Sequence, residues 1–143
     1  MRVLVSILLM PTLTFGVDLK DLTIDNIADY ENPYEKARLA SNGSDHEVVL
    51  NHVHFSECRG AVIGGLGRLW SMQQASKRGE SKKEIMNYHL KDFEDRTKKE
   101  LEEVGQLKAQ YEVVKLAYEY KDNQEEFPRV AMAMCLKINK ELF

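Results

Sequence analysis

The sequence has few of the residues that define specialised classes of small protein. It contains two cysteines, three prolines and eight glycines in 143 residues, which excludes a disulfide-dense scaffold and a collagen-like or low-complexity chain. It also lacks a basic surplus, because 20 Lys and Arg against 23 Asp and Glu give a formal net charge of −3. Nucleic acid is therefore not an expected partner. The length and a hydrophobic content of 43% fit one compact domain.

The only long apolar run stands at the start of the chain. Met1 and Arg2 precede an apolar stretch at residues 3–10, and small and mixed residues follow as far as Gly16. This order is typical of a secretory signal peptide, so we expect residues 1–16 to be removed and the mature protein to be periplasmic or secreted. The run has about half the length of a membrane span, which predicts no stable membrane insertion after cleavage. A buried N-terminal strand or helix is the alternative.

Export changes how the two cysteines are interpreted. Cys58 and Cys135 are 77 positions apart, and an oxidising compartment allows such a pair to persist as a disulfide. In the chain-entropy model, closing so long a loop destabilises the unfolded state by about 4–5 kcal/mol. We expect this disulfide; two buried free thiols are the alternative.

The mature chain is predicted to have two parts. Residues 17–43 are rich in Asp, Asn and Glu and show little periodicity, so we expect an N-terminal arm with a short helix near residues 34–40, which either lies over the core or is mobile. Residues 44–143 have regular apolar spacing and form the predicted helical domain.

Capping signals delimit the first two helices of that domain. Ser44 and Glu47 have the spacing of a capping box and predict a helix start at residue 44, and Gly79 predicts its end near Arg78. The apolar face of this helix is expected to comprise Cys58, Ala61, Val62, Gly65, Leu66, Leu69 and Met72. A second capping box follows at once in Ser81 and Glu84. Whether the second helix continues through the charged residues 94–103 is left open.

Two further helices follow from apolar spacing. One carries the stripe Val104, Leu107, Tyr111, Val114 and Tyr118. The last is expected to bury Phe127, Val130, Ala131, Met134, Cys135, Ile138 and Leu142, with Pro128 in its first turn. No segment alternates as a strand does, so the predicted fold is all-α, with about four helices in a compact bundle tied by one disulfide.

Glycines are concentrated in the first long helix. Gly60 and Gly64 are four residues apart, as are Ala61 and Gly65, which predicts that a neighbouring helix approaches closely on that side; a helix of another chain would fit the same surface. No phosphate-binding glycine motif is present. Gly60, Gly64 and the single tryptophan, Trp70, are therefore the candidate partner-binding residues.

Histidines cluster near Cys58. His46, His52 and His54 precede it within thirteen residues, which makes His52 and His54 candidates for metal ligands. Their helical spacing places them on different faces, and a disulfide would remove the sulfur ligand. We therefore expect solvated surface histidines and no metal or other cofactor. The sequence also has no Gly-x-Ser-x-Gly or His-Glu-x-x-His motif, so an enzyme is not expected.

The last 80 or so residues carry a set of generic features in a recognisable order. These are Cys58, Lys77-Arg78-Gly79, Ser81 with Glu84, Ala117-Tyr118 and Cys135-Leu136. In this order the chain resembles a loose group of small exported bacterial all-α proteins of uncharacterised function. The resemblance implies no catalytic residues.

These observations favour an exported, non-enzymatic binding protein of the bacterial envelope with a protein partner. An immunity or inhibitor protein that acts on an envelope-targeting hydrolase, either bacterial or phage-encoded, is the leading hypothesis. One alternative is an acid-stress periplasmic chaperone, and another is a metal-binding protein that uses the region from His46 to Cys58. A homodimer is compatible with each of them.

Overall fold

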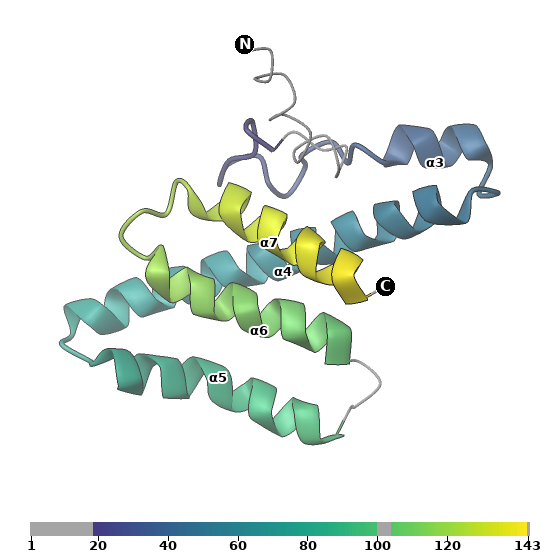
Figure 1. Cartoon of the computed structure of the whole chain (residues 1–143). Helices are drawn as coiled ribbons and strands as arrows, with labels where there is room; N and C mark the ends of the chain where they lie inside the picture. The colour runs from purple at the N-terminus through teal and green to yellow at the C-terminus, as the bar shows by residue number, and fades with distance from the viewer. Residues whose placement is uncertain (1–18, 100–103, 143) are drawn as a thin grey trace, which may run out of the picture.

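The computed structural model describes residues 19–99 and 104–142, and all regular secondary structure within them is helical. The helices are α3 (Glu35–Ser41), α4 (His46–Lys77), α5 (Lys82–Lys99), α6 (Val104–Glu119) and α7 (Phe127–Leu142) (Figure 1). The all-α prediction is confirmed, with five helices rather than about four because the short helix of the arm, α3, is also formed. The predicted signal peptide at residues 1–16 lies outside the described residues.

Helix α4 organises the bundle. Its 32 residues extend about 48 Å, and it contacts each of the other four helices. Helix α6 packs against α4, α5 and α7. In Figure 1, α7, α6 and α5 follow one another from top to bottom, and α4 crosses behind α7. The side of α4 that faces its neighbours buries Phe55, Cys58, Val62, Gly65, Leu66, Leu69, Met72 and Ala75. The predicted stripe is thus buried, except that Ala61 is only half-buried.

The start of α4 differs from the prediction. Asp45, not Ser44, is the N-cap, and its side chain accepts a hydrogen bond of 3.2 Å from the backbone N–H of Val48. The Ser44 hydroxyl donates instead to the carbonyl of Ser41 in the turn that follows α3, at 2.6 Å. Because that turn uses the Ser44 side chain, the predicted capping box with Glu47 is wrong and α4 begins two residues later.

The end of α4 is as predicted. Gly79 has a φ of +88°, in the left-handed region that a residue without Cβ adopts at little cost. The backbone N–H of Gly79 donates to Ser76, and that of Glu80 donates to Ala75, at 3.0 and 3.1 Å. This pair of bonds is the Schellman arrangement, which satisfies carbonyls that the helix end would otherwise leave unpaired.

The second capping box is confirmed at the start of α5. The Ser81 hydroxyl accepts from the backbone N–H of Glu84, and the Glu84 carboxylate accepts from that of Ser81, at 3.1 and 2.9 Å. The hydrogen bond from the Ser81 backbone N–H to the carboxylate, and secondarily the interaction with the Ser81 side chain, hold the pKa of Glu84 below its usual value. The helix then continues through Lys99, so most of the charged stretch that was left open is helical.

Helix α7 has the predicted bounds but a different buried face. Met132 and Leu136 are buried, whereas Val130, Met134 and Ile138 are only half-buried. The charged residues of this helix lie on one side, and apolar residues cover most of the remaining arc, which is wide enough for more than one buried face. The contacts with α4 and α6 select the face that contains Cys135.

The N-terminal arm packs against the core. Leu22 and Ile27 are buried, and the rings of Tyr30 and Tyr34 each lie 6.3 Å from that of Phe55 on α4. The Arg59 guanidinium also donates to the carbonyl of Tyr30. Of the two behaviours expected of the arm, the described part shows the first: it lies over the core.

Gly65 is the glycine that allows close packing. A Cβ atom at this position would lie 2.7 Å from Val113 Cγ1 and 2.9 Å from Phe127 Cζ, so α6 and α7 occupy the space that a side chain would need. At Gly64, a Cβ atom would meet nothing within 4 Å.

These two neighbouring glycines provide a matched pair of variants. We expect Gly65→Ala to lower the free energy of unfolding by about 1–3 kcal/mol through overpacking. Gly64→Ala should raise it by up to about 1 kcal/mol, because alanine favours the helix and meets no obstacle. Urea denaturation at low protein concentration measures both changes. Shifts of the same sign for both variants would contradict the assignment of Gly65 as the packing position.

Candidate functional site

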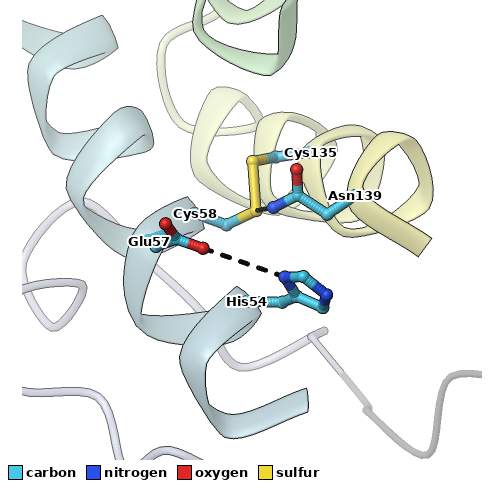
Figure 2. The surroundings of a disulfide bond; sticks show 5 residues. All are labelled: His54, Glu57, Cys58, Cys135 and Asn139. Carbon is cyan, nitrogen blue, oxygen red and sulfur yellow. Dashed lines mark hydrogen bonds and ion pairs between the residues drawn. A yellow bond between two sulfur atoms is a disulfide. The ribbon is translucent and has the colours of Figure 1, made fainter. Parts of the chain in front are cut away.

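The predicted disulfide is present and ties α4 to α7. Cys58 and Cys135 are bonded, their Cα atoms are 5.7 Å apart, and both side chains are buried (Figure 2). Asn139 is also buried, and its Nδ2 donates to the Cys58 Sγ atom at 3.3 Å. In this oxidised state neither sulfur is available as a nucleophile or a metal ligand. The pair is a structural link.

His54 lies one helical turn before Cys58 and is buried, with 6% of its surface exposed. Its Nδ1 atom is 3.8 Å from a carboxylate oxygen of Glu57, the contact drawn in Figure 2. The expectation of solvated histidines is therefore wrong for His54, because the arm and α7 cover this part of α4. His46, by contrast, is exposed.

His52 connects the arm and α3 to α4. Its Nε2 atom is 3.0 Å from a carboxylate oxygen of Glu35, and its Nδ1 atom is 2.9 Å from Asn32 Nδ2. The hydrogen bond from Arg38 holds the pKa of Glu35 below its usual value. His52 and His54 thus have different partners, and within residues 19–99 and 104–142 no three His, Cys, Asp or Glu side chains converge as metal ligands.

The outward side of α4 carries an uncharged surface, which we call the α4 strip. At 100° per residue its members lie within an arc of about 120° on the helix. They are exposed, and none is ionisable, although 30% of the chain is charged. The members of the strip are Val53, Ser56, Gly60, Ile63, Gly64, Gly67, Trp70, Ser71 and Gln74.

The backbone at the glycines of the α4 strip is not covered by any other described part of the chain. A Cβ atom at Gly60, Gly64 or Gly67 would meet nothing within 4 Å. The predicted close approach of a neighbouring helix of this chain is confirmed at Gly65, on the opposite side of α4, and is wrong for Gly60 and Gly64. The strip combines open backbone with the exposed side chains of Ile63 and Trp70, which are 41% and 44% exposed.

Trp70 is held in a defined orientation. Its indole Nε1 donates to the Gln124 side-chain oxygen at 3.1 Å, in the loop between α6 and α7. Gln73 donates to the same oxygen at 3.1 Å and to the carbonyl of Lys121 at 2.7 Å. An exposed tryptophan whose orientation is fixed loses little entropy when it is covered, which suits a binding residue.

A depression of about 270 Å³ borders the α4 strip on the side of α5 and α6. Its lining includes Glu57, Arg68, Phe93 and Gln110 as well as strip glycines. The Arg68 guanidinium lies 5.3 Å from the Phe93 ring centroid and donates to the carbonyl of His89 at 3.2 Å. Burial, and secondarily the charge of Arg68, lowers the pKa of His89.

Comparisons with protein-family models, with curated proteins and with solved structures gave no significant match. The resemblance to small exported helical proteins therefore stays a prediction. Among the described residues, no helix has both the length and the apolar character of a membrane span.

Removal of the disulfide should cost a large part of the stability. We expect the Cys58→Ala/Cys135→Ala double variant to lose about 2–5 kcal/mol of unfolding free energy, because its unfolded chain is no longer restricted by the 77-residue loop. Urea unfolding of the oxidised wild type and the variant measures the difference. Reduced wild-type protein provides the control and should behave as the variant does. Equal midpoints for all three samples would contradict this expectation.

The lowered pKa of His89 predicts a pH dependence of stability. Since the folded pKa lies below the unfolded value of about 6.5, the unfolded state binds the proton first. The stabilisation is complete above pH of about 6.5 and is lost as the pH falls toward the folded pKa. His89→Gln should reduce this loss, measured by urea unfolding across that range, whereas the exposed control Asn87→Gln on the same helix should retain it. An unchanged slope in His89→Gln would contradict the assignment.

Proposed function

We propose that this chain is a non-enzymatic binding protein of an oxidising compartment, periplasmic or secreted, and that it engages a protein partner through the α4 strip. The observation that carries the proposal is the strip itself: a continuous uncharged helix face that exposes Ile63 and a fixed Trp70 beside bare glycine backbone.

The compartment is supported by the buried disulfide. A bond between residues 77 positions apart persists where thiols are oxidised and is rare in a reducing cytosol. The predicted signal peptide at residues 1–16 belongs to the same proposal, because it provides the route to such a compartment.

The chemistry of the α4 strip restricts the partner. Tryptophan is among the residues that contribute most to binding energy, and interface centres are depleted of charge. The open backbone at Gly60, Gly64 and Gly67 favours a partner that inserts large apolar side chains. From Val53 to Gln74 the strip is about 30 Å long, which suits a partner that presents a helix. An envelope-targeting hydrolase, which the chain would inhibit, is the partner class that the sequence favours.

Site-specific photo-crosslinking tests this proposal. The full chain, with its leader, is produced in a bacterial host that carries candidate partners, and a photoreactive amino acid replaces either Ile63 or Ala133. Ala133 is the matched control, because it is exposed on α7 and lies away from the strip. We expect discrete protein adducts from position 63, identified by mass spectrometry, and none from position 133.

A second variant controls for specificity. Gly67→Glu places a charge in the middle of the α4 strip, where the fold has room for it, so it should abolish the adducts from position 63 without unfolding the protein. Absence of adducts at position 63, or equal adducts at both positions, would overturn the proposal.

A further inference from the structure

Large side chains and glycines alternate along part of the α4 strip. In chain order, the strip presents open backbone at Gly60, the side chain of Ile63, open backbone at Gly67 and the indole of Trp70. When a second copy of α4 runs antiparallel to the first, the order of these four positions is reversed. Each side chain of one copy then faces an open glycine of the other. A surface with this property is complementary to itself when two copies meet with their helices antiparallel across a two-fold axis.

We propose that the α4 strip binds a second copy of this chain, with the two α4 helices antiparallel and related by a two-fold axis near residue 65. This inference rests on the proposed function, since it assigns a partner to the same surface. In this register Trp70 of one copy covers Gly60 of the other, and Ile63 covers Gly67. A parallel pair would instead set Trp70 against Trp70 and leave the glycines facing one another.

The space that this register needs is present. Nothing lies within 4 Å of a Cβ atom built at Gly60 or Gly67, so each can receive a side chain from the second copy. Gly64 lies close to the two-fold axis and is equally open, which allows the helix axes to approach to the short end of the usual distance of about 8–10 Å. The hydrogen bond to Gln124 fixes the Trp70 indole before the copies meet.

Charge also favours a second copy. Identical surfaces repel when they carry like charges at the centre, and the α4 strip carries none. Glu57 and Arg68 border the strip on one side, that of the depression. A two-fold axis perpendicular to both α4 helices places these borders on the same side of the dimer. Along the helix axis, Glu57 of one copy is then about 7 Å from Arg68 of the other. Two opposite-charge pairs are then within side-chain reach at the rim, where they favour the antiparallel register.

Sedimentation equilibrium of the purified chain tests the association. A contact built mainly from one helix of each copy falls at the low end of interface sizes, so we expect a dimer, at twice the monomer mass, with a dissociation constant of about 1–100 µM. Gly67→Glu and Ile63→Lys should each weaken this association at least tenfold. The control Ala133→Glu adds the same charge to an exposed site on α7 and should leave it unchanged.

Mixing the two charged variants tests the register. In the antiparallel pair, Lys at position 63 of one copy meets Glu at position 67 of the other, while the second pair of positions keeps its natural residues. An equimolar mixture of Ile63→Lys and Gly67→Glu should therefore form a heterodimer, detected by native mass spectrometry, at concentrations at which each variant alone is monomeric. Failure of the mixture to associate would overturn the antiparallel register.

The outcomes separate this inference from the proposed function. If the wild type stays monomeric at about 1 mM, the second copy is excluded as the occupant. Adducts of other proteins at position 63 would then still support the proposed function. If the chain is monomeric and position 63 gives no adducts, both proposals fail. Circular dichroism melts of each variant exclude loss of folding as the cause of dissociation.

Discussion

The covalent link between α4 and α7 is the constraint from which the rest of the structure follows. Because Cys58 and Cys135 are bonded in the core, one side of α4 must face α7 and, with it, α6. At 100° per residue, the positions in register with Cys58, such as Leu69, are buried, and those on the opposite side are exposed. The α4 strip lies there because, within residues 19–99 and 104–142, the helices packed against α4 contact its other sides.

Features determined by adjacent residues were predictable. The capping box of Ser81 and Glu84 and the left-handed Gly79 depend on a few consecutive residues, and both occur as expected. The pairing of the two cysteines followed from their number and from the predicted export. The start of α4 was wrong for an equally local reason, since the turn after α3 had already used the Ser44 hydroxyl.

Apart from the disulfide, features determined by distant residues were not predictable. Gly64 and Gly65 are adjacent and chemically identical, yet one is open and the other touches Val113 and Phe127, because only the packed helices distinguish them. The partner of Trp70 lies 54 positions later in the chain, a distance at which no local pattern connects them. Sequence reasoning therefore identified Trp70 and the glycines as candidates, but it assigned Gly60 and Gly64 to contacts within the chain and overlooked Gly67 and Ile63 as members of one surface.

The position of Trp70 also makes the unmodified chain its own optical probe. It is the only tryptophan in the sequence, and it lies in the α4 strip rather than in the core. Indole emission moves to shorter wavelength when water is removed from the ring. The emission wavelength of the natural protein thus reports whether the α4 strip is exposed to water or covered by a partner. No added label is needed, because no other tryptophan contributes to the signal.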